Sequence, residues 1–130
     1  MKFNLTKLLT VSAACIITLS VVTNAATLVG TSTATKSDTQ TSTTGSIVAL
    51  WGSTGTGNLK VRSTNSTTVT AEAKAVRAWI PDNTLASCSS STSTYATNNG
   101  FNLPYQDNGY YIKLSGVKSA KGNGEFEILR

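Results

Sequence analysis

Two runs near the C-terminus, 110–115 and 125–129, place apolar side chains at every second position. Alternation with a period of two is typical of a strand that buries one face and exposes the other. The segment between the runs is rich in Gly and Asn, which adopt turn conformations easily. The pattern therefore predicts a β-hairpin whose turn uses Asn123 and Gly124.

The exposed face of this hairpin would pair opposite charges. In the expected register Lys113 lies across from Glu125 or Glu127, a contact of about 0.2–1 kcal/mol that mainly disfavours a shifted register. The two runs resemble the closing hairpin of secreted bacterial β-sandwich accessory domains, such as the pre-peptidase C-terminal type. This resemblance implies an exported β-sandwich and assigns no functional residue.

Earlier in the chain, short runs with similar patterns predict further strands. The run 45–51 has apolar residues on both faces, which indicates a central strand, and 59–63 alternates. The run 67–80 fits a strand or a helix, and we favour a strand because every neighbouring run predicts one. The Ser- and Thr-rich run 85–96 predicts a strand pair, or a strand and a loop.

Turn-forming residues at 81–83, 98–100 and 107–109 separate these runs at short intervals. Many short strands without a helix predict an all-β fold. We expect a small antiparallel β-sandwich of six to seven strands, jelly-roll or immunoglobulin-like, formed by residues 45–130.

The N-terminal residues have the pattern of a secretory signal peptide. Two lysines precede an apolar run, 8–22, and small residues precede Ala26. The run is shorter than the roughly 20 residues of a membrane-spanning helix. We therefore predict a cleaved signal peptide, residues 1–25, and secretion. A lipoprotein anchored at Cys15 is less favoured, because the apolar run continues beyond that residue.

Thr and Ser dominate residues 26–44, which follow the predicted cleavage site. Segments with so few apolar residues rarely pack into a core, so a mobile arm or linker is expected. Because Thr is β-branched, an edge strand is the alternative.

Composition limits the partner classes. The chain has a net charge of +5, and removal of the two lysines in residues 1–25 lowers it to +3. The remaining cations are scattered along the sequence, which argues against a nucleic-acid partner. One domain of this length can bury a modest core unaided.

The inventory of catalytic residues is small. The chain contains no histidine, so Ser-His-Asp triads, Cys-His dyads and histidine zinc sites are unavailable. We predict no enzyme activity, no metal and no cofactor. Glu125 and Glu127, about 7 Å apart on one strand face, are the best carboxylates for a glycosidase-like hydrolase.

Cys88 is the one cysteine outside residues 1–25, so no intramolecular disulfide can form. We expect a small buried hydrophobe there. A disulfide-linked dimer through Cys88 is the alternative.

Aromatic residues are the best candidates for binding, since exposed Trp and Tyr rings stack on sugars or anchor proteins. Trp51, Tyr110 and Phe126 are expected in the core because of their place in the alternation. The predicted binding residues flank turns or lie in an expected loop at 98–106; they are Trp79, Tyr95, Phe101 and Tyr105.

These observations favour a secreted, non-enzymatic β-sandwich that binds a cell-wall polymer, a glycan or a secreted protein. The first alternative is a secreted antimicrobial, bacteriocin-like protein, which the small size, mild basicity and Gly, Ser, Thr and Asn content suggest. The second alternative is a small carboxylate-dependent hydrolase. We expect no nucleic-acid partner and no stable membrane span in the mature chain.

Overall fold

The computed structural model describes residues 25–104 and 108–130, which form eight strands and no helix. The predicted signal peptide lies almost entirely outside these residues. The strands are β1 (Leu28–Lys36), β2 (Ser42–Thr44), β3 (Gly55–Ser63), β4 (Val69–Ala75), β5 (Asn83–Ser90), β6 (Ala96–Leu103), β7 (Tyr110–Ser115) and β8 (Gly122–Leu129).

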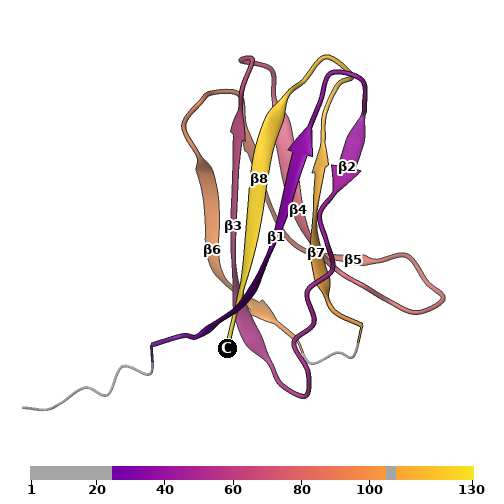
Figure 1. The fold of residues 1–130 in the computed structure, drawn as a ribbon, viewed down its shortest axis with the longest axis vertical. Coiled ribbons are helices and arrows are strands. Elements are labelled where there is room, and N and C mark those ends of the chain that lie inside the picture. The colour runs from indigo at the N-terminus through magenta and orange to yellow at the C-terminus, as the bar shows by residue number, and fades with distance from the viewer. Residues whose placement is uncertain (1–24, 105–107) are drawn as a thin grey trace, which may run out of the picture.

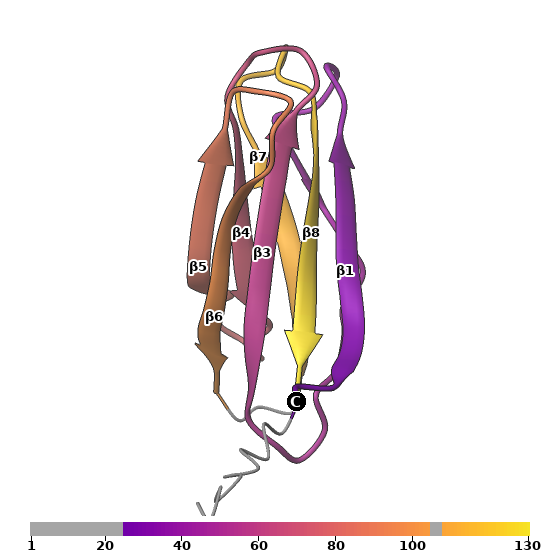
Figure 2. The same cartoon turned by 90° about the vertical axis from the view of Figure 1, so that its left-hand side faces the viewer.

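The strands form two antiparallel four-stranded sheets that face each other (Figures 1 and 2). The first sheet has the order β1-β8-β3-β6 and the second has the order β2-β7-β4-β5. The predicted all-β antiparallel sandwich is confirmed, and the ambiguous run 67–80 contains strand β4. β1 pairs with β8, β2 with β7, β3 with β6 and β4 with β5, which is the jelly-roll arrangement.

The core fills the space between the sheets, because alternate side chains of each strand point inward. Tyr110 and Phe126 lie there as expected, with ring centroids 6.5 Å apart in an edge-to-face contact. The largest buried aliphatic side chains around them are Leu59, Val61, Val69, Leu103, Ile112, Leu114 and Ile128.

The predicted hairpin between the last two strands is wrong. β7 belongs to the second sheet and β8 to the first, and residues 116–121 cross between them. The apolar faces of the two strands meet across the core. Alternation shows which face of a strand is buried, but it does not show which strand is the partner.

The charge pairs expected for that hairpin are therefore different. Lys113 lies opposite Glu72 of β4, and neither Glu125 nor Glu127 is its partner. Glu125 instead pairs with Lys60 of β3, whose ammonium nitrogen lies 3.0 Å from Oε1. Charges on β8 thus connect strands within the first sheet.

Asn123 and Gly124, the predicted turn, lie inside β8. A Cβ added to Gly124 would come within 2.6 Å of Leu114 Cδ2 and 2.8 Å of Ile112 Cδ1. The glycine therefore allows the two sheets to approach, and it does not form a turn.

The predicted central strand 45–51 is also wrong. The segment makes one isolated bridge, from Val48 to Tyr110, and the Gly45 amide donates to the Ile112 carbonyl at 2.9 Å, but the segment forms no strand. Leu50 enters the core, whereas Trp51, expected in the core, is 72% exposed. The apolar residues on the two sides of this segment therefore have different roles: Leu50 packs in the core, and the Trp51 ring lies in solvent.

Residues 26–44 contain β1 and β2, the edge strands of the two sheets, and not an arm. Threonines of β1 point outward while Ser32 and Ala34 point inward. The buried Ser32 hydroxyl donates to the Ser46 carbonyl at 2.7 Å and accepts from the Ile112 amide at 3.1 Å. These bonds satisfy a polar side chain inside the core.

Strand pairing brings the start of β1, the end of β8, the end of β4 and the start of β7 to one end of the sandwich. Leu28 at the start of β1 pairs with Leu129 at the end of β8, and Ala75 at the end of β4 pairs with Tyr110 at the start of β7. Tyr110 also donates its hydroxyl to the carbonyl of Pro104, just after β6. The two sheets therefore meet at this end, from which the connections 45–54 and 76–82 leave.

Candidate functional site

We call this end, with the connections 45–54 and 76–82, the tryptophan end. The large apolar side chains exposed there are Leu28, Val29, Ile47, Trp51, Trp79 and Ile80. Single exposed apolar residues are common on protein surfaces, but several at one end of a small domain are typical of an interaction site.

The β4–β5 connection, 76–82, projects from the second sheet and carries Trp79 at its centre (Figure 1). Trp79 is fully exposed and has a φ of 66°, in the left-handed region that non-glycine residues rarely adopt. Both ends of the loop are fixed. The Val76 amide donates to the Gly109 carbonyl at 3.0 Å, and the Arg77 amide donates to Asp82 Oδ1 at 2.8 Å.

A pocket of about 280 Å³ lies at the base of this loop. It is lined by Thr44, Gly45, Ile47, Val76, Asp82 and Tyr111. Asp82 and Tyr111 supply its fixed polar groups, and Ile47, Val76 and the Tyr111 ring supply apolar surface. The pocket thus combines an apolar wall with a carboxylate.

Asp82 and Tyr111 hold each other in place. The Tyr111 hydroxyl donates to Asp82 Oδ2 at 2.8 Å. The hydrogen bond from the Arg77 amide, and then that from Tyr111, lower the pKa of Asp82 below its usual value. Burial, followed by the hydrogen bond to Asp82, raises the pKa of Tyr111 to about 12. At neutral pH the pair is therefore a carboxylate that accepts a bond from a protonated phenol.

Two cations lie near enough to this carboxylate to affect it. The charges of Lys74 and Arg77 also contribute to the lowered pKa of Asp82. Lys74 Nζ donates to Thr84 Oγ1 at 2.8 Å, and that hydroxyl donates to Glu72 Oε1 at 3.1 Å. Two cations therefore act on Asp82 weakly, while its oxygens retain free lone pairs.

Tyr95, a predicted binding residue, lies away from Trp79, before the start of β6. Its ring centroid is 5.5 Å from Lys60 Nζ and 5.0 Å from Arg62 Cζ. These are cation–π contacts on the outer face of the first sheet. Tyr95 and Trp79 therefore do not form one surface.

Phe101 does not lie in a loop, because 96–103 forms β6, so the predicted loop is wrong for residues 98–103. Gly100, with a φ of 74°, forms a bulge there, and its amide donates to Asn58 Oδ1 at 3.0 Å. Phe101 is half-buried, with its ring centroid 5.6 Å from that of Phe126. Tyr105 lies outside the described residues.

The sequence reasoning missed Ile47, Trp51, Asp82 and Tyr111 at the tryptophan end. Tyr111 gave a usable signal, because the alternation of β7 places this aromatic ring on the polar face. Asp82 gave none, since Asp before Asn after a proline is typical of an ordinary turn. Their contact spans 29 positions in the chain, so no local pattern reveals it.

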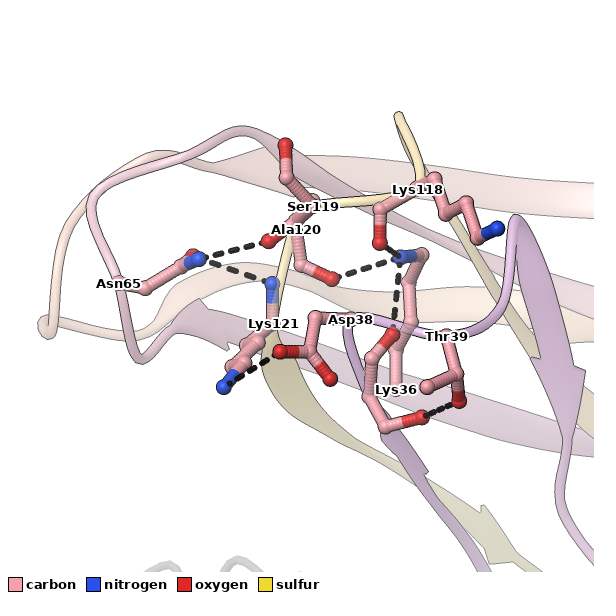
Figure 3. Close-up of polar contacts among 9 residues, drawn as sticks. Lys36, Asp38, Thr39, Asn65, Lys118, Ser119, Ala120 and Lys121 are labelled. Atoms are coloured by element: carbon pink, nitrogen blue, oxygen red, sulfur yellow. Dashed lines mark hydrogen bonds and ion pairs between the residues drawn. The ribbon is translucent and has the colours of Figure 1, made fainter.

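At the opposite end of the sandwich, which we call the lysine end, Lys36 is only 1% exposed. Its ammonium donates to the carbonyls of Ala120 at 2.6 Å, Ser37 at 3.3 Å and Lys118 at 3.5 Å (Figure 3). It also donates to the carbonyl of Val117 at 2.9 Å. Backbone oxygens thus replace water around this charge. The hydrogen bonds from Lys36 also hold the β7–β8 connection in place.

Neighbouring polar groups at the lysine end also bind each other (Figure 3). Asn65 donates to the Ser119 carbonyl at 2.7 Å and accepts from the Lys121 amide at 3.0 Å. Lys121 Nζ lies 3.0 Å from Asp38 Oδ2. Because these groups satisfy one another, the tryptophan end is the better candidate for binding.

The carboxylates proposed for hydrolysis lie on the outer face of the first sheet. Glu125 is paired with Lys60, and Glu127 accepts from Asn58 Nδ2 at 3.3 Å. Glu127 also lines a smaller depression of about 150 Å³. Within 25–104 and 108–130, no three His, Cys, Asp or Glu residues are grouped as metal ligands.

The Cys88 thiol is half-buried, and burial raises its pKa. Its sulfur lies 3.6 Å from the Ala96 carbonyl oxygen and 3.9 Å from that of Leu59. A thiol with a raised pKa is a poor nucleophile at neutral pH. A disulfide dimer through Cys88 stays an untested prediction.

Comparison with known proteins gives no relative: no family model matches the chain, and no curated protein is significantly similar. In the part of the chain that the structure describes, no helix has the length and apolar character to cross a membrane.

Proposed function

We propose that this protein is an exported, non-enzymatic binding protein that captures a cell-surface polymer, glycan or secreted protein with its tryptophan end. The observation that carries the proposal is Trp79, fully exposed with a left-handed backbone. A left-handed non-glycine residue costs about 1–2 kcal/mol, and an exposed ring contributes no burial to folding. A partner that covers the ring would explain both features.

Export is supported by the n-region, apolar run and small-residue site in residues 1–25. A non-enzymatic role is supported by the lack of histidine in the sequence and by the pairing of Glu125 with Lys60. The alternative hydrolase remains testable, since Glu125→Gln would abolish any turnover that depends on that carboxylate.

The test is retention of the mature chain, 26–130, on intact producer cells, purified cell wall and immobilised secreted proteins. We expect one of these to retain the protein, and Trp79→Ser to weaken the retention by at least about tenfold, as for an aromatic hot spot. Val117→Ser is the matched control, because Val117 is exposed at the lysine end. Retention that Trp79→Ser leaves unchanged, or a measured turnover without retention, would overturn the proposal.

A further inference from the structure

We infer that the pocket at the base of the β4–β5 loop binds one ring of an uncharged carbohydrate, with Asp82 accepting hydrogen bonds from its hydroxyls. This inference rests on the proposed function, since the pocket belongs to the tryptophan end. It adds the chemical class of the ligand and the residues that recognise it.

The size and lining of the pocket suit a single sugar ring. Its volume of about 280 Å³ is near the lower limit of about 300 Å³ for small-molecule sites. A pyranose has apolar C–H faces and a polar edge. Ile47, Val76 and the Tyr111 ring can cover the C–H face, while Asp82 and the exposed Thr44 hydroxyl can meet the polar edge.

Asp82 is held in place to accept hydrogen bonds. A carboxylate has about four lone-pair sites, and the amide of Arg77 and the hydroxyl of Tyr111 occupy one on each oxygen. The remaining sites are directed by these two bonds before any ligand arrives. A fixed acceptor reduces the entropy lost on binding.

The surrounding charges favour a neutral ligand. Lys74 and Arg77 already act on Asp82 electrostatically, so a ligand ammonium group would compete with two resident cations. An anionic ligand would meet the carboxylate itself. Hydroxyl donors of an uncharged sugar avoid both costs.

The β4–β5 loop, whose two ends line the pocket, offers a second contact for a longer saccharide. Val76 and Asp82, the first and last residues of the loop, line the pocket, and Trp79 and Ile80 stand exposed between them. A second sugar ring can stack on the indole. Oligosaccharides are therefore expected to bind more tightly than the monosaccharide.

The test uses glucose, galactose, mannose and N-acetylglucosamine, with their di- to tetrasaccharides, in calorimetric and nuclear magnetic resonance titrations of the mature chain. We expect at least one series to bind, and Asp82→Asn to raise the Kd by about tenfold or more, as for loss of a hydrogen bond to a charged group. Tyr111→Phe keeps the ring and frees Asp82, so a several-fold weakening is expected. The affinity should change little between about 50 and 500 mM NaCl, because the ligand is uncharged.

Asp38→Asn is the matched control, since Asp38 is an exposed carboxylate at the lysine end. Absence of binding to all four series, equal weakening by Asp38→Asn and Asp82→Asn, or an affinity that falls steeply with salt would overturn the inference. If no sugar binds but Trp79→Ser abolishes capture of a secreted protein, this inference fails and the proposed function stands. If a sugar binds through Asp82 but no producer cell, cell wall or secreted protein retains the mature chain, the proposed function fails instead.

Discussion

Two charged side chains, at opposite ends of the sandwich, are held by backbone groups. The Lys36 ammonium is enclosed by carbonyl oxygens, and the Asp82 carboxylate accepts from the Arg77 amide. The difference is access: Lys36 is buried, whereas Asp82 lines a pocket. Lys36 therefore contributes to stability, while Asp82 keeps oxygens for a ligand.

Replacement of Lys36 should destabilise the fold. Lys36→Met keeps the length of the side chain but removes the donor, so the carbonyls of Ala120 and Val117 lose a charged partner. We expect a loss of about 2–4 kcal/mol in the free energy of unfolding, measured by urea denaturation. Lys118→Met, at an exposed lysine nearby, should change stability by less than about 0.5 kcal/mol. Equal stability of the two variants would contradict this role.

Titration of Tyr111 should report the bond to Asp82. The pKa of Tyr111 is raised from 10.0 to about 12, so its contribution to stability is complete below about pH 10 and is lost as pH rises through 12. Asp82→Asn removes the charge and weakens the bond, so the pKa of Tyr111 should fall while burial keeps it above 10.0. Ultraviolet absorbance titration measures this, with Tyr111→Phe to assign the signal. An unchanged titration in Asp82→Asn would contradict the contact.

Among the strand connections, the one between β4 and β5 is special because it stays within one sheet. In this jelly roll the first four strands pair with the last four in reverse order, from β1 with β8 to β4 with β5. The chain therefore resembles one long hairpin that has folded over, and the β4–β5 loop is its tip. It is therefore not needed to cross the core. Because the loop does not have to span the two sheets, it can project from the sandwich and carry Trp79.

The strain at Trp79 predicts a trade-off between stability and binding. Trp79→Gly should raise the free energy of unfolding by about 0.5–1 kcal/mol, because the relief of a left-handed φ exceeds the entropic cost of glycine. Ile80→Gly, which relieves no positive φ, should lower it by a similar amount. Thermal unfolding and the retention assay measure both properties. If Trp79→Gly is stabilised and still binds fully, the trade-off is contradicted and the left-handed backbone at Trp79 has no role in binding.

The strands in the runs 59–63, 67–80, 110–115 and 125–129 could be located from the sequence because alternation is a local property of each segment. It correctly placed Tyr110 and Phe126 in the core. Partners could not be predicted, because the partner of each strand lies at a distance set by the whole fold. The pocket could not be predicted for the same reason. In the sequence Tyr111 is an aromatic residue on the polar face of a strand and Asp82 is a turn residue, and nothing local shows that they are in contact.

At the scale of the whole molecule, the pairing of β1 with β8 joins residues from the two ends of the described chain, such as Leu28 and Leu129. This pairing places β1 at an edge of the first sheet, and the connections between strands gather at two ends. Polar contacts cross-link the lysine end, while exposed apolar rings occupy the tryptophan end. One end is thus suited to holding the sandwich together and the other to contacting a partner.

This division predicts unequal hydrogen exchange at the two ends. At the lysine end, the amides of Gly116, Ala120 and Lys121 donate to Thr41, Val117 and Asn65, so they should exchange slowly. In the β4–β5 loop, Val76 and Arg77 should be protected by their acceptors, while Trp79 and Ile80 exchange fast. Exchange followed by nuclear magnetic resonance measures each amide, and a saturating oligosaccharide should slow Trp79 and Ile80 without affecting Ala120. Fast exchange at Ala120, or no response of the loop to a bound ligand, would contradict the assignment of the two ends.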